Sequence, residues 1–204
     1  MSSSLTAAPS DVQGSDARFN TIPSLDGAPP LVTVRHLTKT YRGRPALRDL
    51  SLSLPAGRIV GLMGANGCGK TTLLKILAGV LADYEGQVRI AGHAPGPLSK
   101  ALVSFLPDAD FLATSLTPPR AIAQFSRLFA DFDAAKARRL VDFFALPAER
   151  SIKEMSKGMG EKLRIALMMS RRARVYLLDE PISGVDPAAR EIILDGVLRD
   201  FESD

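Results

Sequence analysis

The chain has 204 residues, of which 46% are hydrophobic and 24% are charged, a balance typical of an ordinary soluble globular protein. Its single cysteine, Cys68, excludes an internal disulfide framework, and no apolar run is long enough to cross a membrane. A formal net charge of +4 gives no case for a nucleic-acid partner.

Residues 1–30 are rich in Ser, Ala, Pro, Gly and Asp, which predicts a disordered tail before a domain over residues 31–204. Residues 31–37 favour a β-strand, and residues 38–44 favour a polar turn. Leucines alternate with polar residues over positions 50–54, which predicts a second strand with one face in water. Two antiparallel strands here indicate a small β layer packed against an α/β core.

An apolar run at residues 59–63 leads into residues 64–72, which match the phosphate-loop pattern GxxxxGK[ST], and residues 73–78 favour a helix. Strand, glycine-rich loop and helix is the context that this motif requires. Backbone N–H groups of such a loop can surround a phosphate chain, while Lys70 adds a charge and Thr71 offers a hydroxyl to the accompanying Mg²⁺. The residues expected to bind nucleotide are Gly64, Asn66, Gly67, Cys68, Gly69, Lys70, Thr71 and Thr72.

Short strands are predicted beyond the loop at residues 87–91 and 101–106. Amphipathic helices follow at residues 119–131 and 133–146, with Thr117 as the cap of the first. We interpret their large apolar side chains as core, with a hydrophobic docking surface as the alternative. These side chains are Phe125, Leu128, Phe129, Leu140, Phe143 and Phe144.

A long helix is predicted at residues 161–172, and a final helix is predicted to begin at Pro187. Four arginines lie on the long helix or just after it. We interpret them as a solvated helix face and its end, with an acidic partner or a membrane surface as the alternative. They are Arg164, Arg171, Arg172 and Arg174.

An apolar strand from residue 175 ends in Asp179 and Glu180. Two adjacent carboxylates at the end of a buried strand are costly unless they have a function. Downstream of a phosphate loop, they predict that Asp179 holds the water shell of Mg²⁺ and that Glu180 polarises the attacking water. A strand end that simply faces solvent is the alternative.

Residues 155–159 read Met-Ser-Lys-Gly-Met directly before the long helix. A serine and a glycine at a helix N-terminus, here Ser156 and Gly158, can form a second phosphate cradle. Because one phosphate loop does not need two cradles, the expected use is on a nucleotide held by another subunit. An ordinary N-cap turn is the alternative.

With these motifs, the chain resembles the ATP-binding cassette (ABC) family of transporter ATPases from about residue 31 onward. Residues 64–72 match Walker A, residues 175–180 match Walker B with its glutamate, residues 155–159 align with the LSGGQ signature, and residues 183–186 match the D-loop. The resemblance implies a P-loop NTPase fold of the α/β class, with a RecA-like core, an N-terminal antiparallel β subdomain and a helical signature subdomain over about residues 110–165. Tyr41 falls where the family places an aromatic ring that stacks on adenine.

The resemblance also implies a head-to-tail dimer that holds two ATP molecules, each between Walker A of one subunit and the signature of the other. The dimer is expected to be a homodimer or a heterodimer with a second ABC ATPase subunit. It would drive a separate transmembrane permease from the cytoplasm, peripheral to the inner face of the cell membrane. ATP and Mg²⁺ are the expected cofactors, and no nucleic acid is expected.

The sequence departs from the family pattern at several positions. Lys157 and Met159 replace a small residue and the glutamine of the signature, and Asp108 stands where the family has a magnesium-contacting glutamine. No histidine follows Glu180, although the family has a switch histidine after a further strand. That strand lies between the Walker A and Walker B strands in the family, so we interpret the sequence as a cassette truncated at its C-terminus.

Three functions are compatible with these motifs. The first is the ATP-hydrolysing subunit of a transporter. The second is a degenerate or regulatory subunit that binds ATP with little hydrolysis, which the departures from the family pattern favour. The third is a soluble ABC ATPase of translation or DNA repair, which would bring tandem cassettes or a long coiled-coil insertion, and the sequence shows neither.

Overall fold

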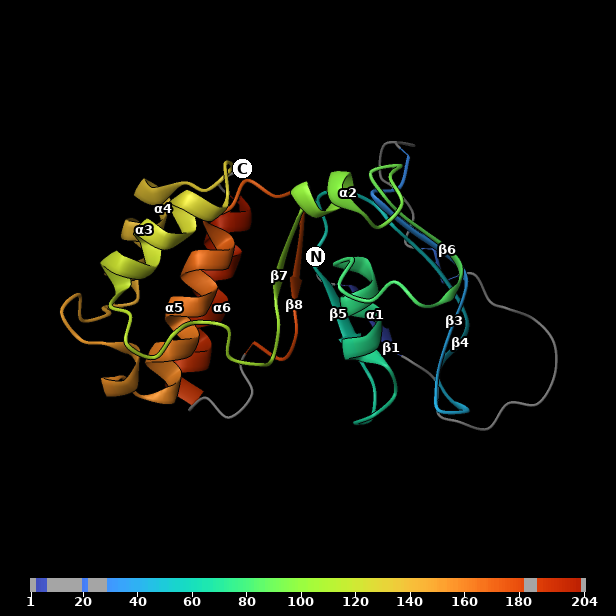
Figure 1. The fold of residues 1–204 in the computed structure, drawn as a ribbon, viewed down its shortest axis with the longest axis horizontal. Helices are drawn as coiled ribbons and strands as arrows, with labels where there is room; N and C mark the ends of the chain where they lie inside the picture. Colours follow the sequence, from blue (N-terminus) through green and yellow to red (C-terminus); the bar gives the residue numbers. More distant parts are fainter. Residues whose placement is uncertain (1–2, 7–19, 22–28, 182–186, 203–204) are drawn as a thin grey trace. The chain divides into compact units, whose positions relative to one another are not determined.

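The computed structural model describes residues 3–6, 20–21, 29–181 and 187–202. The chain divides into two compact units, Met1–Leu102 and Val103–Asp204. Both units contain strands and helices (Figure 1), as the predicted α/β class requires. Within the described ranges, no helix combines the length and apolar character that a membrane span needs.

The first unit contains a four-stranded sheet in the order β2–β4–β3–β6. Its strands are β2 (Asn20–Thr21), β3 (Val32–Tyr41), β4 (Arg44–Leu54) and β6 (Glu85–Ile90). β3 pairs antiparallel with both β4 and β6, which confirms the predicted antiparallel layer.

The turn between β3 and β4 is shorter than the one predicted over residues 38–44. Arg42 and Gly43 alone form it, with φ of 47° and 79°, the positive values that a tight hairpin turn of this kind uses. The prediction was wrong because Thr38, Thr40 and Tyr41 favour a strand, and the hairpin needs only two turn residues.

The phosphate-loop strand β5 (Val60–Met63) pairs in parallel with β1 (Ser3–Thr6), and α1 (Lys70–Leu77) follows the loop. The segments β1 and β2 both lie within residues 1–30, where the sequence predicts a disordered tail. Both segments are extended and find backbone hydrogen-bond partners on β5 and β4, a gain that composition does not reveal.

The chain leaves the first unit through α2 (Pro97–Ala101), which occupies the start of the strand predicted over residues 101–106. The second unit begins with β7 (Val103–Leu106), which pairs in parallel with β8 (Val175–Leu178). Its helices are α3 (Pro118–Leu128), α4 (Ala134–Phe143), α5 (Lys157–Met169) and α6 (Pro187–Glu202), with a 3₁₀ turn η1 (Ile152–Glu154) before α5.

Helix α5 lies at the centre of the second unit, in contact with α3, α4, α6 and β7 (Figure 1). Most of its apolar side chains are buried, and Ile193 of α6 is 1% exposed. The large apolar side chains that the sequence assigned to core differ in burial, and two of them, Phe129 and Leu140, are half-buried. Phe125 and Phe144 are each 4% exposed, whereas Leu128 and Phe143 are 63% and 40% exposed.

Candidate functional site

The phosphate loop begins where β5 ends and closes at the first turn of α1. Lys70 folds back over this loop, and its Nζ donates to the carbonyl oxygens of Gly64 at 2.9 Å and Ala65 at 3.1 Å. The N–H of Cys68 donates to the Ala65 oxygen at 3.2 Å, which tightens the turn. The ammonium group is therefore held at the rim of the loop, where a phosphate chain would lie.

Two glycines of the loop adopt backbone conformations that other residues rarely reach. Gly67 has a φ of 81° and Gly69 a φ of 97°. A Cβ on Gly69 would also overlap with the backbone oxygen of Ala46 and approach Leu47 Cδ2 to 2.7 Å. The sequence therefore needs glycine at position 69 for both reasons, and the N–H of Leu73 then makes the first helical bond to the Gly69 oxygen at 2.9 Å.

The other predicted loop residues are accessible to a ligand. Gly64, Asn66, Gly67 and Cys68 are exposed, and Thr71 and Thr72 are half-buried in the first turn of α1. Tyr41, at the end of β3, is 44% exposed. The sequence interpretation missed Lys39, which is buried on the same strand with its Nζ 4.8 Å from the Tyr41 ring centroid and 2.7 Å from Asp83 Oδ2.

The signature residues lie at the start of α5. Ser156 is its N-cap, with its Oγ accepting from the N–H of Met159 at 3.2 Å and its carbonyl accepting from Gly160 at 3.0 Å. The helix begins at Lys157 rather than at residue 161, because the Ser156 cap compensates for the low helix propensity of the two glycines in the first turn. Gly158 therefore lies in the first turn of a helix, as a phosphate cradle would require.

Three predicted acids follow the paired strands of the second unit. Asp179 is 3% exposed, and its N–H donates to the Leu106 oxygen at 2.9 Å, so β7 and β8 end side by side. Glu180 is exposed and has a φ of 49°, a left-handed conformation that costs energy and is frequent at functional sites. Asp108 is exposed in the loop after β7. The carboxyl ends of parallel strands are where α/β proteins bind ligands.

The predicted site residues are thus distributed between the two units. Tyr41 and the phosphate loop belong to the first unit, and Asp108, Asp179, Glu180 and the signature belong to the second. The D-loop predicted at residues 183–186 lies outside the described residues. In the described ranges, no three His, Cys, Asp or Glu side chains gather closely enough to hold a metal ion by themselves.

Two of the four arginines that we interpreted as solvated are in fact enclosed by contacts. The Arg164 side chain is 12% exposed and reaches Glu161, Asp110 and the backbone of Asp108. Arg171 is 7% exposed and reaches Asp131 and the Val103 oxygen. Arg172 and Arg174 are exposed, as predicted. The sequence could have indicated these ion pairs through Glu161, three positions before Arg164, and Asp131, forty positions before Arg171. Only the first spacing is local enough to be recognised as a pair on one helix face.

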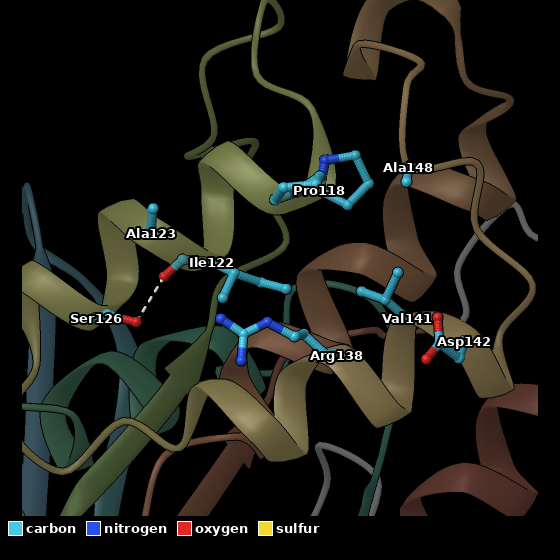
Figure 2. Close-up of a pocket in the computed structure, with 9 residues that line it drawn as sticks. Pro118, Ile122, Ala123, Ser126, Arg138, Val141, Asp142 and Ala148 are labelled. Atoms are coloured by element: carbon cyan, nitrogen blue, oxygen red, sulfur yellow. Dashed lines mark hydrogen bonds between the residues drawn. The ribbon is translucent and has the colours of Figure 1, made fainter.

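A pocket of about 270 Å³ lies between α3 and α4 (Figure 2). Ile122 and Val141 form its apolar walls, and Arg138 and Asp142 stand at its edge. Ser126 turns its hydroxyl back to the Ile122 oxygen at 2.9 Å. None of the predicted nucleotide-binding residues lines this pocket.

Glycine-rich loop, buried strand-end acid and capped signature define an ABC-type nucleotide-binding domain. A family model described as ABC transporter matches residues 47–183, and the chain belongs to this family and carries its ATPase domain. A solved ATP-binding subunit of an ABC transporter superposes with a TM-score of 0.72 at 25% identity, over 85% of this chain and 75% of the other.

Curated relatives agree with this assignment. The ABC transporter ATP-binding protein YtrB of Bacillus subtilis is 28% identical over 80% of this chain and 57% of its own length. The aliphatic sulfonates import ATP-binding protein SsuB 1 of Xanthomonas axonopodis pv. citri is 35% identical over 79% of this chain and 66% of its own length. The chain thus spans between half and two thirds of these relatives.

Proposed function

We propose that this protein binds and hydrolyses ATP as the energising subunit of a transporter whose membrane permease is a separate chain. The observation that carries the proposal is the phosphate loop, in which Lys70 rests on the Gly64 and Ala65 carbonyls and Gly69 admits no side chain. Relatives named as ATP-binding proteins of import and export systems support a role in transport.

Each predicted residue has a role in this proposal. The loop amides and Lys70 bind the phosphates, and Tyr41 stacks on the adenine ring. Thr71 and Asp179 are the oxygen donors suited to Mg²⁺, with Asp108 reaching metal-bound water. Bound Mg²⁺ supplies charge neutralisation at the phosphates. Glu180 orients the attacking water and accepts its proton.

The signature completes the site of a partner subunit. Ser156 and Gly158 lie at a helix N-terminus, which favours an anion, and the Ser156 hydroxyl keeps its hydrogen available for a phosphate oxygen. We therefore propose a homodimer or a heterodimer with a second ABC ATPase subunit. Its place is in the cytoplasm, on the inner face of the cell membrane and in contact with the permease.

Two measurements on the variant Glu180→Gln test this proposal: the rate of phosphate release, and the equilibrium binding of a fluorescent ATP analogue. We expect turnover to fall by about a hundredfold or more, because a positioned general base contributes roughly 10²–10⁴. Binding should stay within about twofold, since the loop and Lys70 are untouched. Glu149→Gln, at an exposed position outside the site, is the matched control. Unchanged turnover in Glu180→Gln would remove Glu180 from this role.

A second candidate is a regulatory subunit that binds ATP with little hydrolysis. Asp108 in place of a neutral glutamine, together with Lys157 and Met159 in the signature, favours it. Phosphate release measured with and without a candidate permease in proteoliposomes separates the two. Turnover that stays at background in both conditions, with tight ATP binding, would establish the regulatory subunit.

A further inference from the structure

Arg164 joins the signature helix to the loop after β7. Its Nη1 lies 3.1 Å from Asp110 Oδ1 and 3.4 Å from the Asp108 carbonyl oxygen, and its Nη2 contacts Glu161 Oε2 one turn earlier on α5. The guanidinium thus contacts two acids and one backbone carbonyl. The chain segment it holds is the one that carries Asp108.

These ion pairs contribute little to the stability of the fold. The Glu161 side chain is 6% exposed, and burial raises the pKa of its carboxyl despite the opposing effect of Arg164. Buried ion pairs recover their desolvation cost incompletely, and apolar residues of similar volume are often as stable. The Asp110 side chain is 90% exposed, where an ion pair contributes little. The fold gains little from this cluster, whereas the loop gains a fixed position.

We propose that Arg164 is a positioning residue that fixes the loop at residues 107–111 against α5, so that Asp108 and the signature keep a set spacing. The inference rests on the proposed roles of Asp108 and Ser156. Helix α5 would then fix the positions of both residues. Asp108 serves the chain's own nucleotide, and Ser156 serves the nucleotide of the partner subunit. Arg164 itself touches no reacting atom, and it acts through Asp108.

Two readouts test this role, loop exchange and turnover. In hydrogen–deuterium exchange, Arg164→Met should make the amides of residues 108–111 exchange at least about fivefold faster, because the loop loses its anchor. In phosphate release, the same variant should lower kcat about tenfold and raise the Mg²⁺ concentration for half-maximal rate, with KM for ATP within about twofold. Arg164→Lys, which keeps the charge but not the fork of donors, should restore part of both.

Arg172→Met is the matched control, because Arg172 is 78% exposed and contacts Asp133 instead. A cycle with Asp108→Asn tests whether Arg164 acts through Asp108: in that background, Arg164→Met should change kcat less than twofold. If Arg164→Met alone unfolds, the double variant Glu161→Gln with Arg164→Met takes its place, because it removes both buried charges and leaves neither unpaired. We expect this double variant to fold and to show the same fast exchange in the loop.

Loop exchange equal to that of Arg172→Met would overturn the positioning role, whether or not the wild type turns over. A full tenfold loss in the Asp108→Asn background would show that Arg164 does not act through Asp108. Absence of wild-type turnover with fast loop exchange in Arg164→Met would instead count against the proposed function and leave the positioning role supported.

Discussion

Two arginines with several contacts lie on α5 or just after it, and the two clusters differ in what they hold. Arg171, just beyond the C-cap of the helix, makes two 3.1 Å contacts with Asp131, donates to the Val103 oxygen at 2.7 Å and stacks on Phe129. Arg164, in the middle of the helix, meets two acids, one buried and one almost fully exposed.

The Arg171 cluster joins three pieces of the second unit. The N–H of Asp133 donates to the Ser170 oxygen at 2.8 Å, the N–H of Arg172 donates to the Asp131 oxygen at 3.0 Å, and the Tyr176 hydroxyl donates to the Arg171 oxygen at 2.5 Å. The α3–α4 connection, the end of α5 and β8 are thereby fixed together. The Arg164 cluster holds an exposed loop that carries Asp108, the predicted magnesium-contacting acid. We infer that the Arg171 cluster secures the fold and that the Arg164 cluster positions the site.

The largest expected effect on stability is that of Arg171→Met. The variant removes the cation that faces Asp131, whose side chain is 27% exposed, and the donor to the Val103 oxygen. Breaking a buried pair by removing one partner costs roughly 3–5 kcal/mol. Because Asp131 is partly exposed, we expect a loss of about 3 kcal/mol in unfolding free energy, at the lower end of this range. Chemical denaturation measures it.

Arg172→Met is the control for that measurement, since it lies next in the chain and its contact with Asp133 is exposed. Its loss should be below about 0.5 kcal/mol, as for most surface ion pairs. A similar loss in both variants would contradict the structural role of Arg171.

A smaller effect is expected from Asp133→Ala. Asp133 caps α4, with its Oδ1 accepting from the N–H of Lys136 at 2.9 Å, and loss of such a cap costs about 1 kcal/mol. The hydrogen bond from Lys136 lowers the pKa of Asp133 below its ordinary value, and the contact with Arg172 lowers it further. This contribution is therefore present above pH 3.8 and is lost as the pH falls through the folded-state pKa.

Thr117→Ala is the matched control, because Thr117 occupies the N-cap of α3 without a side-chain cap hydrogen bond. Its unfolding free energy should change by less than about 0.5 kcal/mol. Equal losses of unfolding free energy in Asp133→Ala and Thr117→Ala would contradict the role of the Asp133 side chain as a cap.

Glu161→Gln should give the smallest change, visible mainly in its pH dependence. Burial raises the pKa of Glu161, so the folded protein binds this proton more tightly than the unfolded chain does. The charged carboxylate therefore costs stability as the pH rises from 4.5 through the folded-state pKa. Between these two pH values, the unfolding free energy of the variant should increase relative to that of the wild type. At higher pH, the difference between the two should stay constant. A difference independent of pH would contradict the raised pKa.

Local patterns predicted the parts of the fold that depend on local chemistry. A helix begins at Pro187 as the sequence predicted, α3 begins at Pro118, one residue before its predicted start, and the phosphate loop lies between a strand and a helix. The β3–β4 turn and the start of α5 were misplaced, since strand propensity and one serine cap outweighed the polar and glycine residues nearby. The pairing of β1 with β5 and the contact of Arg171 with Asp131 join segments about 57 and 40 residues apart, beyond the range of any local pattern.

The different roles of Arg164 and Arg171 are tested most directly by measuring kcat and unfolding free energy together for two variants. One is Arg171→Met, and the other is Arg164→Met combined with Glu161→Gln, which leaves no buried carboxylate without its cation. The effects should cross. The double variant should lose about tenfold in kcat with less than about 1 kcal/mol of stability, and Arg171→Met should lose about 3 kcal/mol with kcat within about twofold where it is folded. Equal losses of stability in the two variants, with turnover falling only as the folded fraction falls, would contradict it.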